Sequence, residues 1–360
     1  MKKRIPQLDA VRGIAILIVM VHNSLNKFPT LPLQRVFAFG WMGVDLFFVL
    51  SGFLITGILV DTRQSQGYFK NFYARRCLRI WPLYYSVLIF MLVFIPLLYP
   101  AMWSAVAARS SPRWAFPFFL QNFVLKSAEG AVGPLGVTWS VAIEEQFYLV
   151  WAVVVRYCPP IQLRRIAAAV ICLSPILRFG LSLYRIDLYS NFFCRLDGLM
   201  AGGLLALIVH SNTFQPGKFL RVAWLLFLVA LPLAVAAESI HARWLTLSFS
   251  AVASAAFVYL ALFARQAWFR AVMANRALVY TGTISYGLYL LHKIPFDLLQ
   301  ALHLDRHSFL AFLSGLAASY ILAALSWNLL EKPFLGLKRF FEFRRGTLYD
   351  PNDRVASIAR

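Results

Sequence analysis

Apolar stretches close to membrane-spanning length recur along the whole chain, with short polar segments between them. A helix rises about 1.5 Å per residue, so about 20 apolar residues cross the hydrocarbon core of a bilayer. The stretches that fit this length cover residues 13–28, 36–60, 80–99, 138–156, 166–183, 192–209, 221–237, 244–263, 279–302 and 308–330. The pattern predicts an all-α integral membrane protein, a bundle of about ten transmembrane helices.

Segments outside this pattern are interpreted from their length and flanks. The apolar piece 114–124 is too short to cross a bilayer and lies in a long loop, 100–137, which favours a re-entrant or interfacial segment. The basic start of the chain resembles a signal peptide, but no small-residue cleavage site follows it, so we expect a retained first span. Residues 1–335 are expected to form the transmembrane domain and residues 336–360 a short basic cytoplasmic tail.

Composition and charge agree with a membrane protein. Hydrophobic residues make up 60% of the chain, and the mean hydropathy is +0.67. The formal net charge of +20 would suit a nucleic-acid-binding protein, but the segments on the N-terminal side of the membrane hold 24 basic residues and the opposite loops hold 8. The positive-inside rule then places both termini in the cytoplasm. We expect a bacterial inner membrane protein in contact with the lipid bilayer, and no nucleic-acid partner.

A histidine interrupts the first apolar segment. His22 follows Arg12 by ten residues in an otherwise apolar run. An ionisable group at membrane depth is costly and usually functional. The imidazole is either a general base that activates an acceptor hydroxyl or a buried side chain held by a neighbouring helix. Ten helical steps place Arg12 about 15 Å from His22 along the axis and about 80° away around it, unless a local bulge changes the register.

Arginines gather at the predicted cytoplasmic mouth of the bundle. Arg76 and Arg79 are helical neighbours, and Arg75 stands beside them. Planar guanidinium groups bind phosphate in a bidentate manner, so these residues and Arg12 are candidates for holding the phosphates of coenzyme A. The alternatives are ordinary positive-inside charge and, for Arg12, snorkelling to the lipid headgroups.

A carboxylate and two hydroxyl groups share one predicted helix face. Glu144 lies between Ser140 and Tyr148 at a spacing of four residues. A buried carboxylate needs a partner. Glu144 therefore either orients the histidine, holds an acceptor sugar or forms a structural ion pair between helices.

Charged residues also occur in other apolar segments. Asp45 flanks an apolar run in the second segment, and Arg195 and Asp197 lie near the outer end of theirs. The last two either pair locally or face an outer acceptor pocket. His292 is expected to be a packing or hydrogen-bonding residue rather than a second base. No metal-ligand spacing is present, so we expect no metal.

Five blocks of sequence are informative as an ordered set. They are residues 4–15 (RIPQLDAVRGIA), 43–55 (GVDLFFVLSGFLI), 75–85 (RRCLRIWPLYY), 138–148 (TWSVAIEEQFY), and the pair 285–292 (SYGLYLLH) with 331–334 (EKPF). Together they resemble the membrane-bound acyltransferase family 3, which includes the O-antigen and exopolysaccharide O-acetylases, over almost the full length. The resemblance implies about ten helices and a catalytic first-helix histidine. The family usually has ten residues between arginine and histidine, whereas nine separate Arg12 from His22.

The resemblance implies a membrane-bound O-acyltransferase. It would move an acyl group, with acetyl favoured, from cytoplasmic acyl-CoA to a hydroxyl of a glycan or lipid-linked sugar. The candidate residues are His22 and Glu144 for catalysis, Arg12, Arg75, Arg76 and Arg79 for the donor, and Asp45, Ser140, Tyr148, Arg195 and Asp197 for the substrate. The alternatives are a transporter or flippase of a lipid-linked or acylated molecule and an inactive scaffold. The sequence does not predict an oligomeric state.

Overall fold

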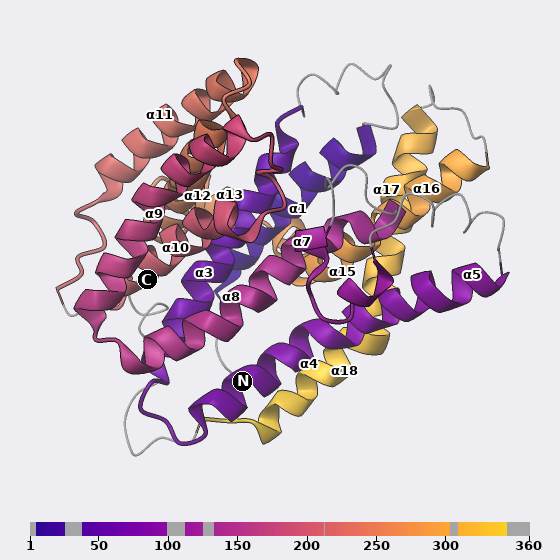
Figure 1. Cartoon of the computed structure of the whole chain (residues 1–360), viewed down its shortest axis with the longest axis horizontal. Helices are drawn as coiled ribbons and strands as arrows, with labels where there is room; N and C mark the ends of the chain where they lie inside the picture. The colour runs from indigo at the N-terminus through magenta and orange to yellow at the C-terminus, as the bar shows by residue number, and fades with distance from the viewer. Residues whose placement is uncertain are drawn as a thin grey trace.

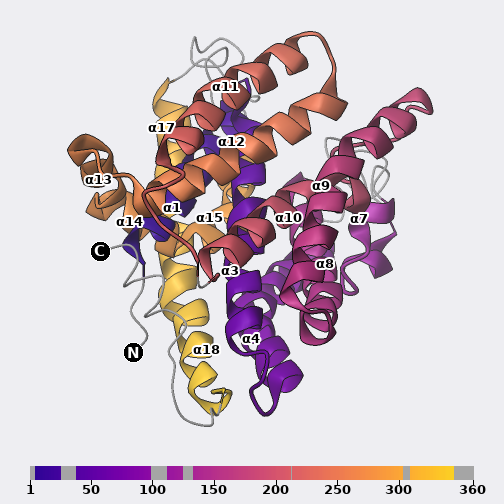
Figure 2. The same ribbon diagram turned by 90° about the vertical axis from the view of Figure 1, so that its left-hand side faces the viewer.

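The structure, a computed structural model, describes residues 5–25, 38–98, 112–124, 133–211, 213–302 and 309–343. Within these ranges the chain consists of helices and connecting turns, with no strand. The long helices form one bundle, and α4 and α18 lie side by side along its lower edge in Figures 1 and 2. The prediction of an all-α integral membrane protein is confirmed.

Each predicted segment overlaps at least one helix, although the helix that corresponds to 80–99 begins twelve residues earlier, at Tyr68. The first half of the chain contains α1 (Pro6–Leu25), α3 (Gly43–Asp61), α4 (Tyr68–Ile89), α5 (Ile95–Leu98), α7 (Gln121–Val124), α8 (Thr138–Tyr157) and α9 (Pro160–Leu183). The second half contains α10 (Phe192–Val209), α11 (Leu220–Ser239), α12 (Arg243–Phe263), α13 (Ala267–Met273), α14 (Arg276–Thr283), α15 (Ser285–Leu291), α16 (Lys293–Ala301), α17 (Phe309–Ser326) and α18 (Lys332–Gly336). The π turns Phe90–Phe94 and Trp327–Glu331 join α4 to α5 and α17 to α18.

Eight helices of the described residues are long and apolar enough to cross a membrane. These spans are Pro6–Leu25, Gly40–Asp61, Tyr68–Leu98, Pro160–Leu183, Phe192–Val209, Leu220–Ser239, Arg243–Phe263 and Phe309–Phe340. The described residues therefore do not reach the predicted count of ten. Helix α8 is formed as predicted, but Glu144, Glu145 and Gln146 lower its hydropathy, and it is not one of the eight.

The predicted span 279–302 is not one helix. It is divided among α14, α15 and α16, with breaks at Ile284 and His292. Pro295 lies in the first turn of α16, where its missing N–H group is tolerated, but this residue cannot continue the hydrogen bonding of α15. Hydropathy alone gives no sign of this break, so the prediction of a continuous helix is corrected.

Glycines allow the central helices to approach closely. A Cβ atom at Gly282 of α14 would lie 1.7 Å from the carbonyl oxygen of Asp9, and one at Gly13 would lie 2.3 Å from a backbone oxygen of α14. Between α3 and α10, a Cβ atom at Gly52 would lie 1.8 Å from a carbonyl oxygen of the other helix, and one at Gly202 would lie 1.9 Å from such an oxygen. Such contacts are typical of helix pairs in membranes, where packing replaces the hydrophobic effect. They fix α1 and α3 at the centre of the bundle.

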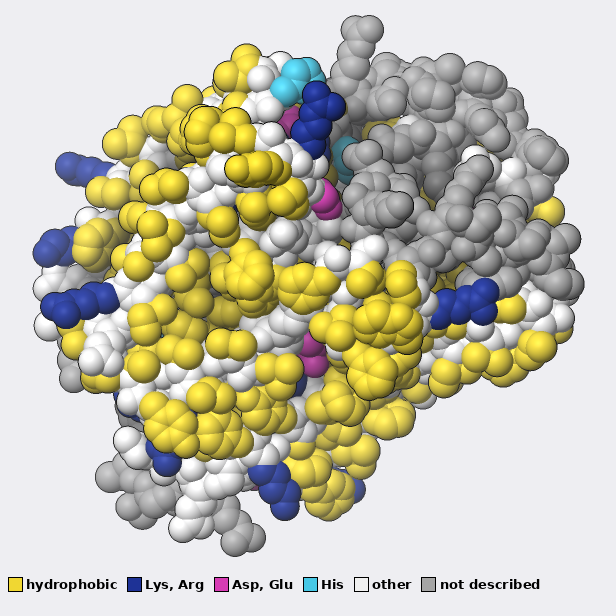
Figure 3. Space-filling view, in the orientation of Figure 1, with side chains coloured by type: hydrophobic (Ala, Val, Ile, Leu, Met, Phe, Trp, Pro, Cys, Tyr) yellow, Lys and Arg dark blue, Asp and Glu magenta, His cyan; other side chains and the backbone are white. Residues whose placement is uncertain are grey.

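The short apolar piece is not a span. It forms a 3₁₀ turn at Arg113–Ala115 and α7, and Gln121 donates to the carbonyl oxygen of Thr138 at 2.9 Å. The adjoining stretches 99–111 and 125–132, and residues 344–360 of the predicted tail, lie outside the described residues. Hydrophobic side chains cover most of the described surface in Figure 3, and basic side chains lie mainly toward its margins.

Candidate active site

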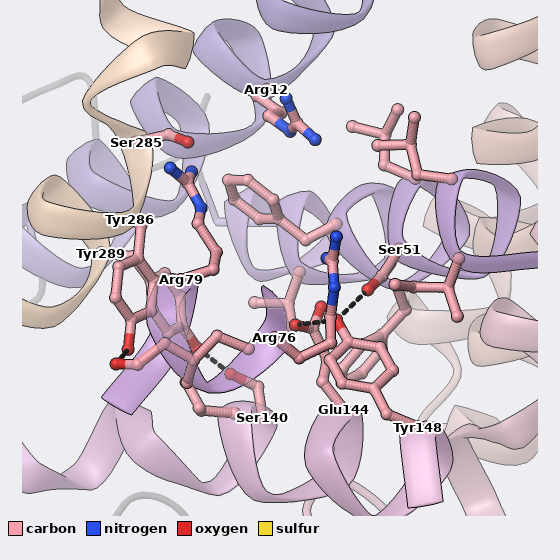
Figure 4. Close-up of a pocket in the computed structure, with 18 residues that line it drawn as sticks. Arg12, Ser51, Arg76, Arg79, Ser140, Glu144, Tyr148, Ser285, Tyr286 and Tyr289 are labelled. Atoms are coloured by element: carbon pink, nitrogen blue, oxygen red, sulfur yellow. Dashed lines mark hydrogen bonds between the residues drawn. The ribbon is translucent and has the colours of Figure 1, made fainter. Parts of the chain in front are cut away.

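A cavity of about 130 Å³ lies inside the bundle, between α1, α3, α4, α8 and α15 (Figure 4). Its polar lining consists of Arg12, Ser51, Arg76, Arg79, Ser140, Glu144, Tyr148, Ser285, Tyr286 and Tyr289. Its apolar lining includes Val44, Phe47, Phe48, Leu54 and Ile80. Six of the eleven candidate residues predicted from the sequence therefore meet in one place. We call this space the arginine cavity.

Arg76 and Arg79 reach the arginine cavity from one face of α4, because three helical steps keep two side chains on the same side. In the part of the chain that the structure describes, neither guanidinium forms a salt bridge, and Nε of Arg76 has no hydrogen-bond partner. The Arg79 guanidinium lies 6.0 Å from the ring centroids of Tyr286 and Trp327. A charge inside a protein is costly unless an opposite charge accompanies it. The pair is therefore suited to an anionic ligand.

Arg12 supplies a third guanidinium from α1. Its Nη1 donates to Oδ1 of Asp9 at 2.7 Å, and its side chain stays 29% exposed. Glu144 is the carboxylate among the lining residues. Three arginines and one carboxylate give the lining an excess of positive charge, which attracts anions more strongly inside the bundle than it would in water.

Arg75 does not line the arginine cavity. Its Nη1 donates to the carbonyl oxygens of Lys338 and Phe341, both at 3.2 Å, and its guanidinium lies 6.0 Å from the Phe343 ring centroid. One helical step turns a side chain by 100°, so Arg75 and Arg76 leave α4 in different directions. The contacts of Arg75 fasten the end of the described chain to α4.

Glu144 belongs to a chain of hydrogen bonds across two helices. The Tyr148 hydroxyl donates to Oε2 of Glu144 at 2.9 Å and bonds to the Ser51 hydroxyl at 2.5 Å. Glu144 and Tyr148 are four residues apart on α8, which places them one above the other. Ser51 comes from α3, so the chain joins the two walls of the arginine cavity and holds the carboxylate toward its interior (Figure 4).

A second group of hydroxyls closes another side of the arginine cavity. The Ser140 and Tyr289 hydroxyls are 2.6 Å apart, and both bond to the carbonyl oxygen of Val137. The Tyr286 hydroxyl donates to the carbonyl oxygen of Ile80 at 2.7 Å. These bonds fix α8 and α4 against α15. The hydroxyl groups of Tyr286 and Tyr289 are therefore already hydrogen-bonded within the protein.

Asp45, Arg195 and Asp197 form buried interhelical ion pairs away from the arginine cavity. Arg195 Nη2 lies 2.5 Å from Oδ1 of Asp45, and Arg178 Nη2 lies 2.8 Å from Oδ2 of Asp197. Arg195 and Asp197 therefore pair with other helices rather than with each other. The Arg195 guanidinium is also surrounded by the rings of Phe48, Trp139 and Tyr189, at 5.2 to 5.6 Å.

His22 stands near the end of α1 opposite Arg12. It is half-buried and is not among the residues that line the arginine cavity. A Cβ atom at Gly40 would lie 2.6 Å from Cβ of His22, so a glycine is required beside it. Helix α1 is a regular α-helix from Pro6 to Leu25 without a π turn, so no bulge removes the offset of about 80° between Arg12 and His22.

Asn23, rather than His22, is aligned with Arg12 along α1, because eleven steps nearly complete three turns. Its Nδ2 lies 3.1 Å from Nε2 of His292. Nδ1 of His292 lies 2.8 Å from the carbonyl oxygen of Tyr289 and must carry the proton that this bond needs. His292 is fully buried, and its bonds tie α15 to α1, which agrees with the hydrogen-bonding role expected from the sequence.

Sequence reasoning did not assign all of the cavity residues. Ser51, Ser285, Tyr286 and Tyr289 line the arginine cavity but are not among the candidate residues predicted from the sequence. The spacing of Tyr286 and Tyr289 is a usable signal, since tyrosines one turn apart in an apolar helix indicate a polar contact on that face.

Comparison with known proteins supplies an independent line of information. A family described as "Acyltransferase domain" matches residues 5–328. The peptidoglycan O-acetyltransferase OatA of Listeria monocytogenes is 26% identical over 360 aligned residues, which cover 92% of this chain and 56% of the relative. A Staphylococcus aureus (strain COL) protein, provisionally named as an O-acetyltransferase, is 26% identical over 92% of this chain and 57% of its own length.

A Bacillus subtilis protein, provisionally named as a peptidoglycan O-acetyltransferase, is 33% identical over 156 residues, or 41% of this chain and 23% of its own length. This chain spans little more than half the length of the Listeria monocytogenes and Staphylococcus aureus relatives. No solved structure matches it.

Proposed function

Because the chain belongs to acyltransferase family 3, matched over residues 5–328, we propose that it is a membrane-bound O-acyltransferase. It moves an acetyl group from acyl-CoA to a hydroxyl of a glycan or of a lipid-linked sugar. The family supports the reaction class, and the names of the relatives support a glycan acceptor. The arginines that line the cavity support acyl-CoA as the donor.

The observation that carries the proposal is the pair Arg76 and Arg79, which lines a cavity inside the bundle without a carboxylate partner among the described residues. Acyl-CoA carries several phosphate groups at one end and a thioester at the other. Planar guanidinium groups match phosphate oxygens in pairs. Arg12 widens the cationic surface, and the bundle excludes water from the thioester.

The proposed reaction needs no acyl-enzyme. Nε2 or Nδ1 of His22 takes the proton of the acceptor hydroxyl, and the oxygen attacks the thioester carbonyl carbon. The carbon–sulfur bond breaks, and the thiolate of coenzyme A leaves with the proton that the imidazole returns. Glu144, held by Tyr148, balances the charge of the arginines while the donor enters and leaves.

The proposed orientation places both termini in the cytoplasm of a bacterial inner membrane. Arg12, Arg76 and Arg79 then open to the side on which acyl-CoA is made, and the His22 end of α1 lies toward the outer leaflet. The acceptor is expected to approach from that leaflet.

The donor assignment is tested with purified protein in liposomes, radiolabelled acetyl-CoA and a soluble glycan. Arg76→Ala and Arg79→Ala should each raise the KM for acetyl-CoA at least tenfold, since a charge-assisted hydrogen bond contributes about 1.5–3 kcal/mol. Arg→Lys changes should recover only part of this loss in affinity, because lysine keeps the positive charge but cannot bind phosphate in a bidentate manner.

Arg75→Ala is the matched control, because that side chain leaves the same helix away from the arginine cavity. Its KM for acetyl-CoA should stay within about threefold of the unchanged protein. Equal effects of all three alanine variants would show that the arginines act through general surface charge. Movement of a labelled lipid-linked sugar across the membrane, without acetyl transfer, would instead indicate a flippase.

A further inference from the structure

A second cavity, of about 350 Å³, lies on another side of α1. Its walls come from α1, the turn Gly40–Met42, α3, α11 and α12. The side chains are almost all apolar and include Ile14, Ile18, Phe227, Leu231 and Phe257. Ser250 and Ser254 of α12 supply the hydroxyl groups of the lining. We call this space the apolar crevice.

The apolar crevice opens toward the hydrocarbon of the bilayer. Helix α11 lies at the margin of the bundle and packs along α12 rather than α1 (Figure 2). Leu231 lines the crevice and is still 39% exposed, and Leu228 on the same helix is 63% exposed. In a chain that spans the membrane, hydrocarbon lies against this surface. A crevice with such a mouth is suited to an alkyl or isoprenoid chain.

One end of the apolar crevice, at Gly40, lies beside His22. Ile14, Ile18 and His22 follow one another at four-residue intervals along one side of α1. Gly40 lines the crevice, and a Cβ atom there would touch both Ile18 and His22. Arg12 faces the arginine cavity instead. Helix α1 therefore separates a polar, cationic space from an apolar one, and His22 lies at the end of the apolar side.

We propose that the apolar crevice binds the hydrocarbon chain of a lipid-linked glycan acceptor and places its sugar at His22. This inference rests on the proposed function and specifies the acceptor as a lipid-carried one. A chain in the crevice enters from the bilayer between α1 and α11, so the acceptor need not leave the membrane. The donor occupies the other side of α1, and the two substrates meet at its His22 end.

The test uses a disaccharide of N-acetylated sugars on a polyprenyl diphosphate, and the same disaccharide without lipid. Ala253→Trp fills the crevice from α12, and Leu231→Trp narrows its mouth at a partly exposed position. Each variant should raise the KM for the lipid-carried disaccharide about tenfold, the factor lost when about two methylene groups are displaced. The KM for the free disaccharide and for acetyl-CoA should change less than twofold.

Leu225→Trp is the control, because Leu225 is 63% exposed on the same helix and does not line the crevice. Its kinetics should equal those of the unchanged protein. If both crevice variants keep the KM for the lipid-carried disaccharide, the inference is overturned, while transfer to the free disaccharide still supports the proposed function. Ala253→Trp is the larger change at a buried position. If the Ala253→Trp protein does not fold, the result for Leu231→Trp decides whether the inference holds.

A binding measurement separates acceptor lipid from ordinary membrane lipid without requiring turnover. A polyprenyl diphosphate disaccharide with a diazirine in its chain is photolysed with the protein in phosphatidylglycerol vesicles. Labelling of α11 and α12 within the crevice, displaced by unlabelled lipid-carried disaccharide but not by added phosphatidylglycerol, supports the inference. Labelling that phosphatidylglycerol displaces equally well shows a general lipid site and overturns it.

Discussion

Arg75 and Arg76 are adjacent in the sequence but have entirely different surroundings. Arg75 donates to the backbone carbonyl oxygen of Phe341, whereas Arg76 faces the arginine cavity. Sequence patterns name the arginine cluster but cannot say which member turns inward, because that depends on how α4 is rotated against α8 and α15. The same limit applies to Asp45 and Arg195, 150 residues apart, whose pairing no local pattern predicts.

His22→Ala should lower the rate of acetyl transfer about 10²- to 10⁴-fold, the usual contribution of a general base. The measurement is transfer from radiolabelled acetyl-CoA by protein whose melting temperature in detergent is unchanged. The KM for acetyl-CoA should change little, since His22 does not line the arginine cavity.

His292→Gln provides the contrast to that variant. It should lower the melting temperature more than the transfer rate, because His292 is buried and holds Asn23. A large rate loss for His292→Gln together with near-normal turnover for His22→Ala would show that His292, and not His22, is the general base.

At the scale of the helices, the apolar pattern of the sequence predicts the ends of some helices closely and misses the breaks in others. The predicted segment 192–209 coincides with α10, and 244–263 differs from α12 by one residue, because polar turns bound both apolar segments. The segment 279–302 is also predicted as one apolar span, but it contains His292, Lys293 and Asp297 and breaks at Ile284 and His292. The mean hydropathy measures how apolar a segment is. It carries no information on whether the backbone hydrogen bonds of one helix continue through the segment.

Gly282→Ala should destabilise the protein by about 1–3 kcal/mol or more, as overpacking does in well-packed interiors. The new methyl group would meet the backbone of Asp9, which cannot move as a flexible side chain can. The readout is the free energy of unfolding in mixed detergent micelles.

Gly180→Ala in α9 is the matched change in open space, with no atom within 4 Å of the new methyl group. It should be neutral or stabilising by up to about 1 kcal/mol, because alanine favours a helix. A similar loss for Gly180→Ala would mean that a general effect of the added methyl group, and not the contact between α1 and α14, governs the effect at Gly282.

At the scale of the whole molecule, the distribution of charge predicts its orientation. A cysteine introduced at position 110 should react with a membrane-impermeant maleimide from outside intact cells, and one at position 266 should react only after the cells are opened. The background for both variants lacks Cys77, Cys158, Cys172 and Cys194. If position 110 is protected and position 266 reacts from outside, the topology is the opposite of the predicted one. The arginine cavity would then open away from the cytoplasm, where acyl-CoA is made.

The placement of two cavities on different sides of α1 has a consequence for steady-state kinetics. Substrates that do not compete for space can be bound together, so the reaction should pass through a ternary complex. Initial rates measured over a grid of both substrate concentrations should then give double-reciprocal lines that intersect. Parallel lines would mean that coenzyme A departs before the acceptor arrives, which requires a covalent acyl-enzyme and therefore a nucleophilic side chain that the mechanism above does not include.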